Sequence, residues 1–377
     1  MKHPVSLPRV IKDIVDAPIS PLVDKAQEAD RKAIAYTCAY VPEPLLNVDG
    51  LFGVRVRAPG VSGTPMADTY LSNVICSYVR SILEFALEGS FQSMNGWVFA
   101  ASCDHMRRLY DNLDYLERPE FIHILDVPHK RSEAAVEWMR EELSQLAERL
   151  AEHFNVQTDD AAVAKAIAAH NEYLAVMRDI GNLRKRPHPP LSGSTFQALL
   201  VAGSSSPKDL ILPHLRVFYE TADKAPGIDD YRARLLLAGS HCDDYQYIRV
   251  IESTGALVVG DRTCTGSIPA LAPIDDEGDP LTVLARRSLS NISCPRMMEE
   301  FDARVAEIVA AVSEFGADGV LLETMKFCDT WGVEASPMIQ ALRAAGIPVL
   351  RLEREYALGS EGQLQTRVQA FLESMGK

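Results

Sequence analysis

Residues 97–127, WVFAASCDHMRRLYDNLDYLERPEFIHILDV, combine two short apolar runs with a helix-length segment between them. This arrangement is typical of a strand, helix, strand unit within a parallel sheet. The same rhythm extends upstream, so the first half of the chain contains four expected strands, at 33–37, 52–56, 97–101 and 121–127. The region therefore predicts a parallel β-sheet covered by helices.

A second series of short apolar runs follows in the C-terminal half. Helix-length intervals again separate its four members, which predicts another parallel sheet. The expected strands are 235–238, 256–259, 319–322 and 347–352.

Two long helices are expected between the two series. Ser132 precedes apolar residues at three- and four-residue spacing from Val136 to Leu150, which predicts a capped amphipathic helix. A second helix is expected over 160–184, before prolines at 187–190 that forbid its continuation. We therefore predict an α/β protein with two parallel-sheet domains joined by a helical connector. Its expected parts are an N-terminal helical segment (1–32), a first α/β domain with the connector (33–190) and a second α/β domain (191–377).

Composition limits the classes of function. Of the 377 residues 47% are hydrophobic and 24% charged, as in folded globular proteins, and the net charge is -14. No basic face is expected, which excludes nucleic acid as a partner. The first residues lack a signal pattern, and no apolar stretch approaches the roughly 18 residues that span a bilayer. We therefore expect a cytoplasmic protein without membrane contact. The one compact basic run, at 184–186, is expected to lie on the solvated surface.

The placement of the cysteines is the most informative local feature. Four of the seven directly follow an expected strand, where loops of a parallel sheet carry ligand sites: Cys38, Cys103, Cys264 and Cys328. Cys76 is expected within a helix over 67–88 that approaches the same cleft. Cys242 and Cys294 are less well placed. Thiolates gathered from distant loops are the usual ligands of iron-sulfur clusters.

Three other interpretations of these cysteines remain open. Free cysteine is often a small buried hydrophobe without a function. A zinc site lacks support, because no CxxC pair occurs and only His105 stands beside a candidate, Cys103. A nucleophilic cysteine needs a base, and no histidine is singled out for that role. There is also neither a GxxxxGK[ST] loop nor a GxGxxG turn between a strand and a helix.

The segments around the cysteines resemble the benzoyl-CoA reductase and 2-hydroxyacyl-CoA dehydratase family. The N-terminal half carries TCAYVPEPLL (37–46), SNVICSYVRS (72–81) and ASCDHMRRLYD (101–111). The C-terminal half carries LLLAGSHCDD (235–244), VVGDRTCTGS (258–267), DPLTVLARRSL (279–289), MKFCDTWGVE (325–334) and GQLQTRVQAFLE (362–373). The resemblance extends from about Ala33 to the end. One departure is Ile268-Pro269, where relatives have an arginine and an aromatic pair.

The resemblance implies two flavodoxin-like domains and a 4Fe-4S cluster on Cys76, Cys103 and Cys328. It makes Cys38, near the open coordination site, and Cys264 accessory candidates. For Cys264, a role in shaping a turn is an equal alternative. Asp104, His105 and Asp329 are weak candidates for a proton donor, since each can instead orient a loop or cap a helix. Cys294-Pro295 is expected to begin a helix.

The resemblance also implies partners and two possible reactions. The partners are a homologous second subunit, a separate ATP-hydrolysing iron-sulfur activator and an acyl-CoA substrate. Reduction of benzoyl-CoA is favoured, because MKFCDTWG is closer to that branch. No carboxylate lies between Asp49 and Asp68, a region that could supply a base in a dehydratase. Two alternatives remain: a subunit of a 2-hydroxyacyl-CoA dehydratase acting through a ketyl radical, and a non-catalytic, cluster-bearing partner subunit. A further alternative, without the resemblance, is a small-ligand-binding α/β protein.

Overall fold

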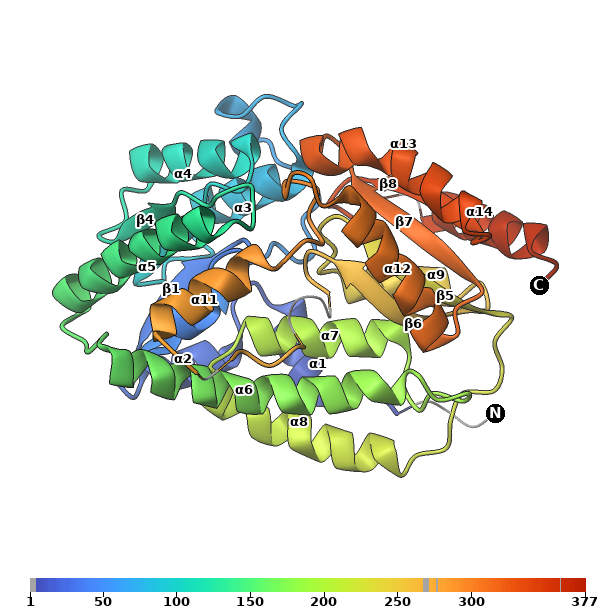
Figure 1. Cartoon of the computed structure of the whole chain (residues 1–377), viewed down its shortest axis with the longest axis horizontal. Helices are drawn as coiled ribbons and strands as arrows, with labels where there is room; N and C mark the ends of the chain where they lie inside the picture. The colour runs from blue at the N-terminus through green and yellow to red at the C-terminus, as the bar shows by residue number, and fades with distance from the viewer. Residues whose placement is uncertain (1–4, 267–270, 276, 360) are drawn as a thin grey trace.

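The computed structural model describes residues 5–266, 271–275, 277–359 and 361–377. It contains two four-stranded parallel sheets (Figure 1). The first has the order β2-β1-β3-β4, with β1 (Lys32–Tyr36), β2 (Leu51–Arg55), β3 (Gly96–Ala100) and β4 (Ile122–Leu125). The second has the order β6-β5-β7-β8, with β5 (Ala233–Gly239), β6 (Ala256–Thr263), β7 (Gly319–Met325) and β8 (Val349–Arg354). All eight expected strands and the α/β class are confirmed.

Both sheets are buried on two faces, which explains their nearly continuous apolar strands. In β1, Ile34 and Tyr36 face one apolar cluster, whereas Ala33 and Ala35 face another, as the two-residue period of a strand requires. The first sheet is covered by α2 (Pro21–Gln27), α3 (Ser77–Leu87) and α4 (Asp104–Leu116) on one side. The second sheet is covered by α9 (Tyr245–Glu252) and α14 (Glu361–Ser374) on one side and by α12 (Phe301–Phe315) and α13 (Asp329–Ala344) on the other.

A layer of helices connects the two sheets. It consists of α1 (Arg9–Asp16), α5 (Glu133–Phe154), α6 (Asp160–Leu183), α7 (Gly193–Ser204), α8 (Lys208–Asp223) and α11 (Pro280–Leu289). Figure 1 shows α11 along α5, and α6 beside α8, and both pairs are in contact. The Ser132 hydroxyl accepts a hydrogen bond from the Ala135 N–H, so the expected cap of α5 is confirmed. The division near residue 190 stays a prediction, because α7 contacts elements of both halves, β2 and β6.

One part of this layer contradicts the expectation of a solvated basic run. Arg184 is only 1% exposed, lies 2.9 Å from the Asp261 carboxylate and stacks over Phe196 at 3.5 Å. Its neighbours at 185 and 186 are at least partly exposed. The guanidinium at the end of α6 is therefore part of the packing between the connector and β6.

The strand order is the same in both sheets, and it indicates where each sheet can bind a ligand. In a parallel sheet whose strand order reverses, ligands bind beyond the carboxyl ends of the two strands at the reversal. These strands are β1 and β3 in the first sheet, and β5 and β7 in the second. Cys38 and Cys103 follow β1 and β3, and Cys328 follows β7. Among the described residues, no helix has both the length and the apolar character needed to cross a membrane.

Candidate functional site

Three half-buried cysteines occupy the same local position at three places in the fold. Each is the N-cap of a helix: Cys76 caps α3, Cys103 caps α4 and Cys328 caps α13. Backbone N–H groups at the start of an α-helix have no intrahelical partner and favour negative charge at the cap. All three sulfurs therefore lie where a thiolate is stabilised by a helix N-terminus.

The position of Cys76 differs from the expectation of a helix over 67–88. The helix begins only after Cys76, because Ser72 forms a turn before it. The Ser72 side chain accepts a hydrogen bond from the Val74 N–H at 3.4 Å, and its carbonyl accepts one from the Ile75 N–H at 2.9 Å. Serine competes with helical backbone bonding in this way. Cys76 thus lies at a helix end, where its sulfur meets free N–H groups.

The three capping thiols share one neighbourhood. They pack against the same apolar cluster beside the first sheet, and Cys103 interacts electrostatically with both Cys76 and Cys328. Burial raises the pKa of Cys76 to about 11 and that of Cys328 to about 12, and it also raises the pKa of Cys103. Backbone N–H groups of α3, α4 and α13 oppose this rise. Without a bound cation these groups are neutral thiols at pH 7, whereas a metal would deprotonate them.

Three thiols from separate loops in apolar surroundings are the donor type of an iron-sulfur site. Among the residues that the structure describes, no three His, Cys, Asp or Glu side chains converge closely enough to hold one metal ion. Cysteines from separate loops, apolar surroundings and N–H groups near the sulfurs are features of iron-sulfur centres. Cys76, Cys103 and Cys328 combine all three.

His105 connects the loops of two capping cysteines. Its Nδ1 accepts a hydrogen bond from the Cys76 N–H at 3.1 Å, and its Nε2 lies 3.2 Å from Oδ2 of Asp329. Asp329 directly follows Cys328, and the His105 side chain is only 9% exposed, so the ring is held from both sides. The side chain of Asp104, by contrast, is 83% exposed. His105 thus lies between the loops of Cys76 and Cys328, whereas Asp104 is exposed and lies 3.7 Å from Arg107.

A second pair of cysteines, Cys264 and Cys294, lies beside the capping group. The two thiols hydrogen-bond each other, which lowers the pKa of Cys294 and raises that of Cys264. The Thr330 hydroxyl links this pair to the capping group, since its Oγ1 lies 3.8 Å from Cys294 Sγ and 3.5 Å from Cys328 Sγ. Cys38 interacts electrostatically with Cys264. The accessory candidates from the sequence therefore lie in the same region as the three caps.

Cys294 is a cysteine that the sequence did not connect with the candidate site. The expected helix start at Cys294-Pro295 is wrong, because residues 291–300 form successive turns and α12 begins at Phe301. The Met297 N–H bonds back to the Cys294 carbonyl at 3.1 Å and closes one of these turns. No spacing in the sequence relates Cys294 to Cys264, since the contact joins two loops from different elements. Cys242, in contrast, is fully buried in the core of the second sheet.

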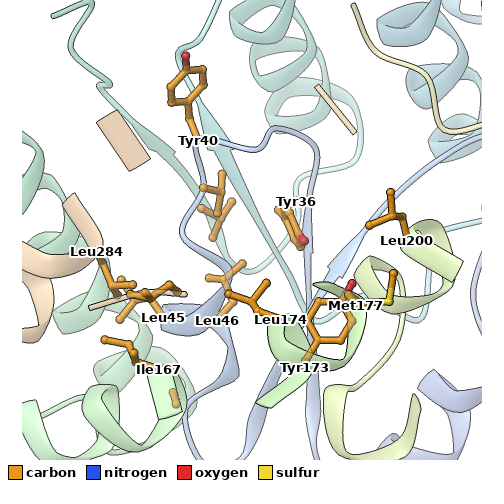
Figure 2. Close-up of a cluster of buried hydrophobic side chains, with 14 of the residues drawn as sticks. Tyr36, Tyr40, Leu45, Leu46, Ile167, Tyr173, Leu174, Met177, Leu200 and Leu284 are labelled. Carbon is orange, nitrogen blue, oxygen red and sulfur yellow. The ribbon is translucent and has the colours of Figure 1, made fainter. Parts of the chain in front are cut away.

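A cavity of about 120 Å³ opens next to Cys264. Apolar and aromatic side chains form much of its wall, among them Tyr36, Tyr173 and Leu174, which Figure 2 shows gathered between β1 and α6. Arg55, at the end of β2, also lines the cavity and donates to the Cys264 carbonyl at 3.3 Å. The departure at Ile268-Pro269 lies outside the described residues.

The cavity wall carries a carboxylate that sequence reasoning missed. Glu43 lies in the TCAYVPEPLL segment and forms an ion pair with Lys208, and both side chains are largely buried. Burial lowers the pKa of the nearby His170 to about 4, although Glu43 opposes this. Glu43 begins the short 3-10 helix η1 (Glu43–Asn47), just before the stretch 50–67 that contains no carboxylate. In the sequence, only the dipeptide Glu43-Pro44 within TCAYVPEPLL marks this position, and its burial becomes visible in the structure alone.

Comparison with known proteins identifies the family. Residues 38–375 match the family model described as 2-hydroxyglutaryl-CoA dehydratase, D-component. The chain belongs to this family. It is 25% identical over 370 residues to the (R)-phenyllactyl-CoA dehydratase beta subunit of Clostridium sporogenes, covering 97% of both chains. It is 26% identical over 350 residues to a benzoyl-CoA reductase subunit of Thauera aromatica, covering 90% and 89%. It is 22% identical over 368 residues to (R)-2-hydroxyglutaryl-CoA dehydratase, subunit beta, of Acidaminococcus fermentans (strain ATCC 25085 / DSM 20731 / CCUG 9996 / CIP 106432 / VR4), covering 96% and 97%.

The membership confirms the family expected from the cysteine segments. Members of the 2-hydroxyglutaryl-CoA dehydratase family act on CoA thioesters as dehydratases or reductases, and the relatives above are each named as one subunit of an enzyme. Identity to the reductase subunit and to the phenyllactyl-CoA dehydratase subunit is nearly equal. The overall similarity therefore does not separate the two reactions.

Proposed function

We propose that this chain is one subunit of an ATP-activated, low-potential enzyme that reduces benzoyl-CoA to a cyclic dienoyl-CoA. In this proposal Cys76, Cys103 and Cys328 hold a 4Fe-4S cluster next to the acyl group. The observation that carries the proposal is the meeting of three cysteine-capped helices at one apolar cluster, in a family that acts on CoA thioesters. The cavity lies on the side of Cys264, which interacts electrostatically with Cys328.

The residues of the chain would prepare the site in three ways. The three helix N-termini stabilise the thiolates, and His105 and Asp329 fix the loops that present them. The apolar cluster behind the cysteines excludes water, which lowers the local dielectric and tunes the potential. When bound, such a cluster supplies single electrons at low potential.

The proposed partners follow from the family and from the chemistry. Each relative is named as one subunit of a larger enzyme, which supports a homologous second subunit for this chain. The sequence resemblance supports a separate ATP-hydrolysing iron-sulfur activator. The cavity wall, with the Arg55 guanidinium, Glu43 and aromatic side chains, suits the acyl end of a CoA thioester.

A second candidate is a subunit of a 2-hydroxyacyl-CoA dehydratase acting through a ketyl radical. Glu43 favours it, because this reaction needs a base near the acyl chain and the carboxylate lies on the cavity wall. A third candidate is a cluster-bearing subunit whose sister alone binds substrate.

The first experiment measures iron and acid-labile sulfide in the anaerobically purified chain with its natural partner, followed by electron paramagnetic resonance after reduction. Replacing Cys76, Cys103 or Cys328 with alanine should each remove most of the iron of this chain. The matched control is Cys242→Ala, a cysteine in the core of the second sheet, which should keep the iron. Unchanged iron in all three cap variants would refute the ligand assignment.

Assays with benzoyl-CoA and with 2-hydroxyacyl-CoA thioesters, in the presence of activator, ATP and reductant, then separate the reactions. Formation of a dienoyl-CoA supports the reductase, and formation of an enoyl-CoA supports the dehydratase. Turnover that survives loss of all three caps supports the non-catalytic subunit.

A further inference from the structure

Two segments of the second sheet bring a histidine and a threonine together at its carboxyl edge. Gly239, the last residue of β5, is level with Thr263, the last residue of β6. His241 and Thr265 each lie two residues farther on, so they emerge side by side. The Thr265 Oγ1 is 2.9 Å from the His241 Nδ1.

The other nitrogen of this histidine faces a carboxylate. His241 Nε2 lies 3.1 Å from Oδ2 of Asp243, and the Tyr356 hydroxyl donates to the same oxygen at 2.8 Å. This nitrogen lies within contact distance of the carboxylate oxygen, although the described geometry does not align the two as an ideal hydrogen bond. Asp243 is 6% exposed and Thr265 7%. The three side chains form a buried line from Thr265 to Asp243.

The protonation states follow from burial and charge. Burial lowers the pKa of His241, although Asp243 opposes this, so the ring is neutral at pH 7. His241, Arg57 and Tyr356 hold the pKa of Asp243 well below its usual range, in spite of burial. An ionised carboxylate only accepts hydrogen bonds, so the hydrogen of the neutral ring belongs on Nε2. Nδ1 is then an acceptor for the Thr265 hydroxyl.

The surrounding elements hold the His241 ring in one orientation. Tyr78 of α3 stacks on it with centroids 3.9 Å apart, and Tyr356 lies at 6.2 Å on a tilt. Two further cations face the ring, Arg55 from β2 and Arg354 from β8, and both disfavour its protonation. Arg354 also donates to the His241 carbonyl at 3.3 Å. A ring fixed in this way keeps Nδ1 directed at one hydroxyl.

The line of side chains ends at the cavity. Thr265 is part of the cavity wall, between Cys264 and Gly266 and near Arg55 and Glu43. Of the three residues of this line, Thr265 is the one that lines the cavity in the described part of the chain. A molecule in the cavity meets Thr265, and His241 lies behind it.

We propose that Thr265, His241 and Asp243 form a proton relay that exchanges a proton with the acyl group of a thioester in this cavity. The inference rests on the proposed function. As an acidic C–H or O–H of the acyl group gives its proton to Thr265 Oγ1, the threonine proton passes to His241 Nδ1. The imidazolium is stabilised by the Asp243 carboxylate, and the electron pair stays on the acyl group. The reverse movement protonates a reduced acyl group. Thr265 is the residue that touches substrate, and His241 and Asp243 position and support it.

The test uses the complete enzyme, with sister subunit, activator, ATP and reductant, and whichever of the two thioesters the wild-type complex converts. Thr265→Val keeps the shape of the side chain but removes the hydroxyl, and it should lower kcat about 100-fold with little change in KM, as for lost acid-base catalysis. Thr265→Ser should restore kcat to within about tenfold of wild type, and His241→Gln should resemble Thr265→Val. The matched control is Thr254→Val, a threonine of equal burial at the opposite end of β6.

The outcomes separate the relay from the proposed function. Iron content and circular dichroism of each variant report on folding, so a loss of kcat with intact iron and fold supports the relay. A Thr265→Val enzyme with kcat within twofold of wild type overturns the relay alone. A Thr265→Ser enzyme as slow as the Thr265→Val enzyme also overturns the relay, because serine keeps the hydroxyl and the loss must then come from the missing methyl group. A wild-type complex that converts neither thioester overturns the proposed function, and the relay with it.

Discussion

Arg296 ties the second half of the chain to the loops of the first. Its guanidinium is fully engaged with main-chain carbonyls: Nε donates to Ser102 at 2.9 Å, Nη1 to Pro128 at 2.9 Å and Nη2 to Val127 at 2.7 Å. The residue is 3% exposed and stacks over Tyr40 at 4.7 Å. Since Ser102 directly precedes Cys103, this side chain also shapes a loop of the candidate cluster site.

The cost of Arg296→Met can be worked from these contacts. Methionine keeps much of the aliphatic length but leaves three buried carbonyls without their donor. A hydrogen bond from a charged group contributes about 1.5–3 kcal/mol, and the released carbonyls relax only in part. We therefore expect a loss of about 4 kcal/mol of unfolding free energy. At roughly 2.1 cal/mol/K of unfolding entropy per residue, this loss lowers Tm by about 5 °C for a cooperative chain of 377 residues.

The assay compares Tm by calorimetry for wild type, Arg296→Met and the control Arg286→Met. Arg286 also makes a two-pronged contact, at 2.6 and 2.8 Å to Glu133, but both side chains are more than half exposed. Exposed pairs contribute little, so the control should stay within about 1 °C of wild type. Equal shifts in the two variants would refute the argument that burial of the carbonyl contacts decides the cost.

Two further predictions concern the packing around the cavity. Gly203→Ala should destabilise the fold by about 2 kcal/mol, because the added Cβ would lie 2.6 Å from the buried Tyr173 ring. Gly332→Ala, at an exposed helical position with open space around it, should instead stabilise the fold by about 0.5–1 kcal/mol. Denaturation of both variants checks the opposite signs, and a shared sign would contradict the packing argument. Burial lowers the pKa of His170 to about 4, so the unfolded chain takes up a proton below pH 6.5 that the folded chain refuses, and stability falls from pH 6.5 toward 4. Between pH 7.5 and 5, the unfolding free energy of His170→Gln should fall by about 2 kcal/mol less than that of wild type. The control His214→Gln, at an exposed position, should show the same change of stability with pH as wild type.

The strands were predictable because they are buried on both faces. Strands buried on both faces, such as β3 and the first part of β7, carry mostly apolar side chains, and this produces short apolar runs that stand out between helices. The loops at the carboxyl ends follow directly from the strands. Cys103 and Cys328 were therefore found at the edge of a sheet from sequence alone.

The rest of the site depends on contacts that leave no local pattern. Cys294 meets Cys264 across two loops, and the turns that bring it there involve ordinary backbone bonding after a proline. The sequence predicts that Arg184 is solvated with its basic neighbours, whereas in the structure it pairs with Asp261, in a strand 77 positions away. The helix expected over 67–88 begins only at Ser77, after a turn at Ser72, so Cys76 lies at its end and not within it. Tertiary packing, and not local preference, decided each of these cases.

Both halves of the chain contribute residues to the proposed site. The first supplies Cys76, Cys103 and the Arg55 guanidinium, and the second supplies Cys328 and the pair His241 and Thr265. Arg55 reaches across to the Cys264 carbonyl, and Tyr40 donates to the Asn291 carbonyl at 2.7 Å, so each half orients loops of the other. Within a single sheet, the crevice where the strand order reverses would bring together only some of these residues. The candidate centre therefore requires both sheets to meet, which explains why the cysteines are spread over some 250 positions of sequence, from Cys76 to Cys328, instead of forming one compact motif.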